Sequence, residues 1–488
     1  MTERDRVRHL LRRLGLGALP EEVDAYTKLG AEKTAQILIE YDKQPDTFNV
    51  SPWEICREDG KDEIYLDSFR PAVHWALQMC MTSRPLQEKL TLFWHDHFAV
   101  SGQKVEFGPS MQSYVDTLRT HAAGNFGELL KAVSQEPAMI FFLDTHMSVK
   151  GQPNENFGRE VMELFTLGIG NYTEKDVQEA ARAFTGWGLR YALFERGGEK
   201  VQEIVREAIA HDNPVVAFAD SPKLHDAGVK TILGQSKKWK PDDVLDMLAG
   251  RPETAQTVCR KLWSFFAYPD PDPAVVNRLA KVFTDGNGEI KPVLYAMVQS
   301  PEFWSDKCVR RQVKSPVDFV IPVLRQLGVG AFLAAQHPKA EPTKPLPALL
   351  RGVGGIAYTL CSQMGMGLLF PPTVAGWNWG EAWISSDSMR QRMTLGGALM
   401  GQDGKDKGGA NAMLARINQL GKPNTPEEMT DRVLAVLDVD FPPEKRLLVV
   451  EACRKNGGPA TLTSGEKASP CLAAMLHLIF ASPDFQFC

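Results

Sequence analysis

The sequence predicts a mainly helical protein, a large globular body of packed helices with at most one small β-hairpin. Apolar residues recur throughout at the 3.6-residue spacing of amphipathic helices, and the strict alternation typical of strands is rare. Hydrophobic residues make up 43% of the chain and charged residues 24%, as in ordinary folded proteins. A chain of 488 residues can bury an ample core without disulfides.

Helical periodicity begins near the N-terminus. Apolar residues stand at i, i+3, i+4 and i+7, at Val7, Leu10, Leu11 and Leu14. Gly15 and Gly17 end this helix, and Pro20 begins the next, because proline is well tolerated in a first helical turn. Similar apolar stripes predict helices over 85–94 and around 258–266. The best strand candidates are 189–195 and 214–219, which would pair as a small hairpin.

Two polar segments suggest a subdivision of the chain. Residues 401–411 and 454–470 are rich in Gly and Lys, which bury little surface and favour loops. They bracket a helical stretch. We therefore expect a main helical domain over 1–400 and a C-terminal helical subdomain over 412–488, packed on the first.

Composition argues against several classes of partner. The net charge is −5 and no basic run is present, so we expect no nucleic-acid binding. No stretch of 18 apolar residues predicts a membrane span, and the chain as given starts without a signal peptide, so a soluble, cytoplasmic protein is expected. None of the eight cysteines forms a Cys-x-x-Cys pair, which argues against a cysteine zinc site or a dithiol redox centre.

The first segment that could carry chemistry is FWHDHFAVS, residues 93–101. His95, Asp96 and His97 follow an apolar helix, and imidazole and carboxylate groups are metal ligands and proton carriers. In a regular helix two residues two apart point about 200° away from each other, so both histidines reach one ion only if the helix ends between them. The alternative is that His97 is a core histidine with a satisfied hydrogen bond.

The second segment spans 154–187 and predicts two helices joined by a turn at 168–172. On the first helix, Glu160 and Glu163 share one face with Arg159 beside them. On the second helix, Arg182 lies one turn from a glutamate with which it can pair. The carboxylates would bind a metal or act as acid and base. The alternative is an amphipathic helix with a solvated face.

Two later segments add polar and aromatic groups. In LHDAGVKTILG, residues 224–234, Asp226 would orient His225 as a base, although a turn with a helix cap explains the same residues. Residues 368–392 contain a double proline and three closely spaced tryptophans, Trp377, Trp379 and Trp383. Such a loop would form a wall for a substrate or a plug between helical layers.

These segments, in this order, resemble the bacterial family known as domain of unknown function 1800. The matching stretches are LLRRLGLG, FWHDHFAVS, NENFGREVMELFTLGIGNYTEKDVQEAARAFTGW, HDAGVKTILG, SPEFW, KSPVDFV, LFPPTVAGWNWGEAWISS and ASPDFQ, which cover nearly the whole chain. The resemblance implies a mostly helical protein and no defined reaction. Many relatives look exported and are often encoded beside sulfatase-like proteins, so a sulfatase-like partner protein is one expectation.

Our leading hypothesis from the sequence is a metal-assisted enzyme, of hydrolase type. His95, His97, Glu160 and Glu163 would hold a divalent metal ion or act as bases. The remaining roles fall to Arg159 and Arg182 as anion-binding groups, to His225 and Asp226 as assisting groups, and to the three tryptophans as a substrate wall. The rival hypothesis is a non-catalytic binding or assembly protein in which the polar cluster is structural. Haem ligation by His97 is a third hypothesis, although no Cys-x-x-Cys-His attachment site is present.

Overall fold

The computed structural model describes residues 1–488 except 62, 192–200, 212–213 and 402–407. The mainly helical fold is confirmed. Strands within the described residues form only two antiparallel two-stranded sheets, and helices make up the rest of the regular structure. Within those residues no single helix has the length and apolar composition of a membrane span. Only the helices α19 (Pro316–Gln326) and α20 (Val329–Gln336) taken together reach this length and composition, and they are bent by 66° relative to each other.

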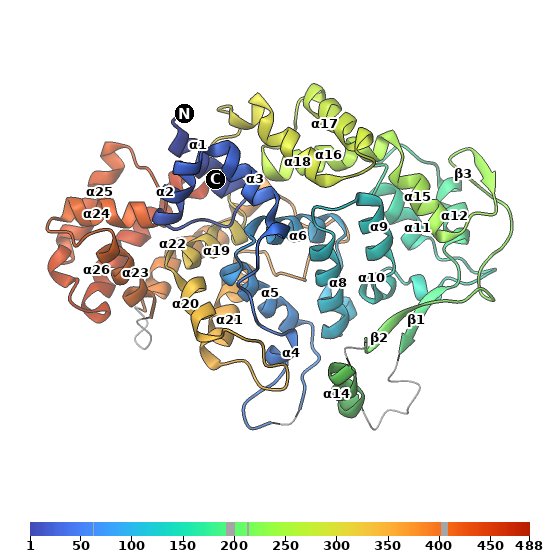
Figure 1. Cartoon of the computed structure of the whole chain (residues 1–488), viewed down its shortest axis with the longest axis horizontal. Helices are drawn as coiled ribbons and strands as arrows, with labels where there is room; N and C mark the ends of the chain where they lie inside the picture. The colour runs from blue at the N-terminus through green and yellow to red at the C-terminus, as the bar shows by residue number, and fades with distance from the viewer. Residues whose placement is uncertain (62, 192–200, 212–213, 402–407) are drawn as a thin grey trace.

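Three helices form the centre of the molecule, α5 (Phe69–Met81), α6 (Pro85–His97) and α8 (Gly108–Thr120) (Figure 1). Nearly every side chain of α6 is buried, including Glu88. The Glu88 carboxylate accepts 2.7 Å hydrogen bonds from Arg119 Nε on α8 and from Trp75 Nε1 on α5. A buried charge is tolerated only when it is paired in this way. These two hydrogen bonds of Glu88 therefore fix how α5, α6 and α8 pack together.

Other helices surround this centre. The N-terminal helices are α1 (Glu3–Arg13), α2 (Pro20–Leu29), α3 (Ala31–Ile39) and α4 (Pro52–Ile55). The helices beyond α8 are α9 (Phe126–Ser134), α10 (Pro137–Phe142), α11 (Glu155–Glu163), α12 (Glu174–Ala183), α14 (Val201–His211) and α15 (Pro241–Ala249). Next come α16 (Pro252–Phe266), α17 (Pro273–Asp285), α18 (Ile290–Gln299), α19 (Pro316–Gln326), α20 (Val329–Gln336) and α21 (Ala348–Gln363).

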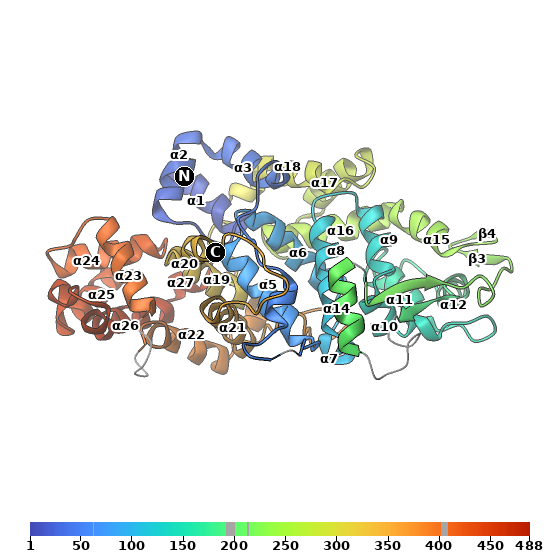
Figure 2. The same cartoon turned by 60° about the horizontal axis from the view of Figure 1, so that its bottom comes forward.

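The C-terminal helices are α22 (Ser386–Leu399), α23 (Gly408–Gln419), α24 (Pro426–Val436), α25 (Pro443–Lys455), α26 (Gly465–Ala481) and α27 (Pro483–Gln486). They lie at the end of the molecule opposite β3 in both views (Figures 1 and 2). Helix α22 packs against α26, and Arg392 of α22 donates to Gln486 Oε1 at 2.9 Å. The expected loop 454–470 was wrong in its second half, because Ser464 caps a helix that begins at Gly465 and continues through Pro470.

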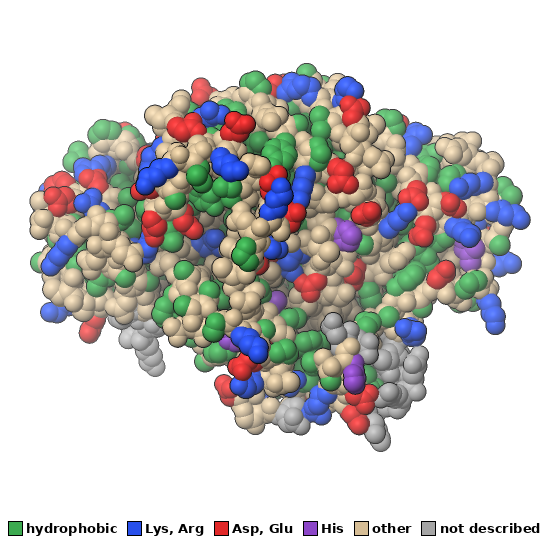
Figure 3. Space-filling view, viewed as in Figure 1, with side chains coloured by type: hydrophobic (Ala, Val, Ile, Leu, Met, Phe, Trp, Pro, Cys, Tyr) green, Lys and Arg blue, Asp and Glu red, His purple; other side chains and the backbone are tan. Residues whose placement is uncertain are grey.

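The first strand pair lies beside α10, and the second lies beside α12. β1 (Trp187–Tyr191) pairs antiparallel with β2 (Val216–Asp220), with Trp187 opposite Asp220. This pair corresponds to the expected hairpin, except that α14 lies between the strands in sequence and residues 192–195 are outside the described residues. A second pair, β3 (Lys230–Ile232) with β4 (Gln235–Lys237), packs on α12 and was not expected. On the face shown in Figure 3, basic and acidic side chains are intermixed.

Candidate functional site

The His-Asp-His sequence lies at the C-terminal end of α6. The helix continues through His97 and is capped by Phe98, so His95, Asp96 and His97 point in different directions. The condition under which both histidines would reach one ion is therefore not met.

His95 is fully buried between aromatic rings. The centroids of Trp75 and Trp377 lie 5.5 Å and 5.3 Å from its own. His95 Nδ1 is 3.1 Å from the hydroxyl of Tyr114, which itself donates to the Phe98 carbonyl. Nδ1 therefore carries the proton, and Nε2 has no hydrogen-bond partner. Burial lowers the pKa of His95 to about 3, so the ring is neutral.

His97 is also buried, and both of its ring nitrogens are engaged. Nε2 lies 3.0 Å from the Phe165 carbonyl and therefore donates, whereas Nδ1 accepts from Lys261 Nζ at 3.2 Å. Lys261, on α16, also donates to the Leu164 carbonyl at 3.0 Å. Burial lowers the pKa of Lys261 to about 8. The lysine and the histidine thus satisfy carbonyls just past the end of α11, where a cation is favoured.

Asp96 connects α6 to the tryptophan loop. Its Oδ1 accepts from the Trp377 backbone N–H at 2.8 Å, and its Oδ2 accepts from Trp379 Nε1 at 2.7 Å. Gly376 has a φ of 82°, and a Cβ at this position would stand 2.2 Å from Asp96 Oδ1. The glycine is therefore required for the close approach of the loop to the carboxylate. Burial raises the pKa of Asp96 to about 6.

The three tryptophans of the loop lie in different surroundings. Trp377 is buried against His95, and Trp383 is buried with its Nε1 unpartnered. Trp379 is partly exposed and contacts Phe265 and Trp383, with ring centroids 4.9 Å and 5.7 Å away. The loop therefore packs as a plug against α6 and α16, while its three indoles stay candidates for substrate contact.

The acidic face of α11 lies close to His95, Asp96 and His97 but does not take part in their hydrogen bonds. Glu163 accepts from the hydroxyl of Tyr172, and Arg159 pairs with Glu174 at 2.8 Å. Glu160 is partly buried, and burial with the nearby Glu163 raises its pKa. Residues 93–101 and 154–187 do meet, as expected, but through His97 and the Phe165 carbonyl. Within the described residues, no three His, Cys, Asp or Glu side chains converge to hold a metal ion.

Arg182, His225 and Asp226 belong to a separate network around α12. Arg182 Nε donates to Asp226 Oδ2 at 2.9 Å, and its Nη1 donates to Glu179 at 2.8 Å. His225 Nδ1 lies 3.0 Å from the Thr185 carbonyl. Asp226 therefore holds Arg182, and it does not orient His225.

The segments that carry these polar residues all lie within a match to a known protein family. A family model described as "Protein of unknown function (DUF1800)" matches residues 9–487. This chain belongs to the DUF1800 family. No curated protein and no solved structure matches it. In this DUF1800 protein, polar residues of one segment bind residues of another. His97 and Asp96 are the main examples.

The hypothesis from the sequence assigned no role to two residues, Asp96 and Lys261, which the structure places at the end of α6 and against His97. Lys261 directly follows Arg260 on α16 and precedes the buried Leu262, so no local pattern distinguishes the lysine that meets His97 from its basic neighbour.

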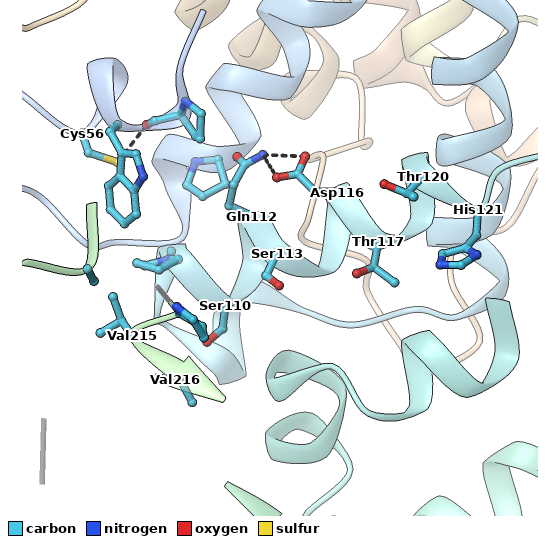
Figure 4. A pocket seen from close by; sticks show the side chains of 17 residues that line it. Cys56, Ser110, Gln112, Ser113, Asp116, Thr117, Thr120, His121, Val215 and Val216 are labelled. Atoms are coloured by element: carbon cyan, nitrogen blue, oxygen red, sulfur yellow. Dashed lines mark hydrogen bonds between the residues drawn. The ribbon is translucent and has the colours of Figure 1, made fainter. Parts of the chain in front are cut away.

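A pocket of about 470 Å³ lies elsewhere in the DUF1800 protein, between α4, α8 and β2 (Figure 4). One wall is the face of α8 and carries the polar side chains of Gln112, Ser113, Asp116, Thr117 and Thr120. The other walls are mainly apolar and include Trp53, Pro71, Val215 and Val216. Periodicity alone did not reveal this pocket, because its walls come from segments distant in sequence.

The polar wall of the pocket is preorganised. Gln112 Nε2 lies 3.0 Å from both carboxylate oxygens of Asp116 (Figure 4), and Arg119 pairs with the same carboxylate. The Thr117 hydroxyl donates to Glu136, which is 8% exposed and has a second oxygen without a partner. Burial raises the pKa of Glu136. Side chains held in this way lose little further entropy when a ligand binds.

Proposed function

We propose that this DUF1800 protein is a binding protein whose ligand is a small, neutral, hydroxyl-rich molecule held in the pocket beside α8. The observation that carries the proposal is the pocket itself, in which a row of polar side chains faces an apolar wall. A volume of about 470 Å³ lies within the range of about 300–1,000 Å³ typical of small-molecule sites.

The chemistry of the walls supports this ligand class. No Lys or Arg is among the described residues that line the pocket, and His121 is the single basic side chain among them, so these walls offer a phosphate or a carboxylate no strong cationic partner. The single acidic group among the described lining residues, Asp116, already has an ion-pair partner in Arg119, which Asp116 shares with Glu88. Hydroxyl and amide groups both donate to and accept from ligand hydroxyls, and a carboxylate accepts from them.

The apolar wall supports the same class from the other side. Trp53 is partly exposed where it lines the pocket, and an indole offers a flat apolar surface. A saccharide or cyclic polyol presents C–H groups on one face and hydroxyls at its edge. Such a molecule matches a pocket with one apolar and one polar wall.

The metal-assisted hydrolase suggested by the sequence has less support. His95 and His97 are buried and hydrogen-bonded within the chain, and both nitrogens of His97 are engaged. The four residues assigned to the metal therefore do not fit such an ion in this arrangement, and His97 does not fit a haem. We favour the rival hypothesis, in which the cluster is structural and the function is binding.

Calorimetric titration with a panel of free monosaccharides, disaccharides and inositols tests the proposal. We expect at least one to bind, and Ser113→Ala and Thr120→Val each to weaken it by about fivefold, since one hydrogen bond contributes about 1 kcal/mol. Thr359→Val is the matched control, because Thr359 is an exposed helical threonine on α21 outside the pocket. Binding by none of these compounds, or binding unchanged by both pocket variants, would overturn the proposal.

A sulfatase-like partner protein stays a prediction from the family resemblance. Co-expression with a sulfatase-like protein, followed by gel filtration, tests it. A stable complex would add a partner to the binding function, and separate elution would exclude this partner under those conditions.

A further inference from the structure

Two cysteines that are distant in sequence meet in the C-terminal part of the molecule. Cys453 lies near the end of α25 and Cys471 lies in α26, and these two helices pack on each other. Cys471 Sγ is 3.5 Å from the Cys453 carbonyl oxygen, and the two thiols are hydrogen-bonded to each other. Both side chains are fully buried and both are free thiols.

The surroundings of Cys471 favour its thiolate. The Gly458 backbone N–H, from the short helical turn η6 (Gly458–Thr461), donates toward its sulfur, while the Thr461 hydroxyl donates to the Gly458 carbonyl at 2.8 Å. The hydrogen bond with Cys453 is the main cause that lowers the pKa of Cys471, and burial opposes it. A thiolate is the nucleophile in thiol–disulfide exchange, so Cys471 is the sulfur that attacks first.

We propose that Cys453 and Cys471 form a reversible disulfide that ties α25 to α26. The oxidant is a low-molecular-weight disulfide. The Cys471 thiolate attacks one of its sulfurs, a new S–S bond forms, and the first small thiol leaves. Cys453 then loses its proton and attacks Cys471 Sγ, and the second small thiol leaves. Two electrons and two protons pass from the cysteine pair to the oxidant.

Both sulfurs are buried, so the reaction needs a local opening of the turn between α25 and α26. The connection between the two helices is short: it contains Gly457, with a φ of 94°, and η6, and α26 begins at Gly465. A connection this short keeps the two sulfurs near each other while the turn opens. Segments of this kind open far more often than the whole protein unfolds.

The experiment uses the folded full-length protein, equilibrated in a series of oxidised-to-reduced glutathione ratios. Remaining thiols are alkylated, and peptides are mapped without reduction. We expect one cross-linked peptide that joins Cys453 to Cys471, lighter by two hydrogens than the reduced pair, with the other six cysteines alkylated. The oxidised protein should have a higher urea midpoint, because the cross-link restricts the unfolded chain.

Two single cysteine-to-serine variants test the proposed cross-link further. Cys453→Ser should leave a glutathione adduct on Cys471, since the second sulfur that would expel it is missing. Cys259→Ser is the matched control, because Cys259 is equally buried on α16 and its replacement should leave the cross-link intact. Complete alkylation of both Cys453 and Cys471 in the wild-type protein at every glutathione ratio would overturn the proposal, whether or not the variants fold.

Discussion

The indole Nε1 of Trp379 donates a 2.7 Å hydrogen bond to Asp96 Oδ2, across 283 residues of sequence. With the second bond, from the Trp377 backbone to Asp96 Oδ1, it holds the tryptophan loop against the end of α6. A carboxylate acceptor makes such bonds stronger than neutral ones, so this contact is a main determinant of how the loop is placed.

The first prediction concerns the energy of this contact. In a double-mutant cycle of Asp96→Ala and Trp379→Phe, we expect a coupling of about 1.5–3 kcal/mol in the free energy of unfolding, as for a hydrogen bond to a charged group. Urea unfolding at pH 8 measures it, because the Asp96 pKa of about 6 leaves the carboxylate ionised there. The coupling should shrink at pH 5. Additive effects at pH 8 would show that the bond contributes nothing.

A glycine pair in the same loop provides the second prediction. Gly376→Ala should destabilise the protein by clearly more than Gly380→Ala. Both positions have positive φ, 82° and 73°, and each alanine carries a strain of about 1–2 kcal/mol. Only at Gly376 does the new Cβ also meet Asp96, since nothing lies within 4 Å of a Cβ at Gly380. Equal losses in the unfolding free energy of the two variants would mean that the loop has room to shift.

The third prediction concerns acid stability. Burial holds the pKa of His95 at about 3, below its ordinary value of 6.5, so unfolding takes up a proton between these values. The stabilising effect is complete above pH 6.5 and is lost as the pH falls toward 3. Below about pH 6, His95→Phe should reduce the slope of unfolding free energy against pH by about 1.36 kcal/mol per unit.

The measured quantity in that experiment is the difference between wild type and variant. Asp96 titrates in the same range with the opposite sign, because its pKa is raised in the folded protein and stability is lost as the pH rises toward 6. His211→Gln, at an exposed position on α14, is the control and should leave the slope unchanged. An unchanged slope in His95→Phe would mean that His95 is protonated in the folded protein.

The fourth prediction concerns metal content. Mass-spectrometric analysis of the protein after exposure to Zn²⁺ or Mn²⁺ and desalting should give the same amount of metal for wild type and for His95→Ala/His97→Ala. The reason is that both ring nitrogens of His97 are hydrogen-bonded, and that the ring of His95 is buried between Trp75 and Trp377. One metal ion per chain in the wild type that is lost in the double variant would instead support the hypothesis of a metal-assisted hydrolase.

The sequence alone predicted those features that depend on local periodicity and capping. The helical class followed from apolar spacing, the helix start at Pro20 followed from the tolerance of proline in a first turn, and the pairing of Arg182 with Glu179 followed from positions one turn apart. The approximate strand pair also followed from alternation and turn residues. Each of these features depends on residues close together along the chain, where helix and strand geometry fix which side chains share a face.

The tertiary structure alone decided which distant groups meet. The sequence placed His95, His97, Glu160 and Glu163 in one hypothetical site, whereas packing turned His97 toward a backbone carbonyl and a lysine on α16. The same holds for Asp96 with Trp379, for the pocket beside α8 and for Cys453 with Cys471. The physical reason is that a buried polar group must find a partner wherever the folded chain supplies one, and one sequence does not say which segments will lie side by side.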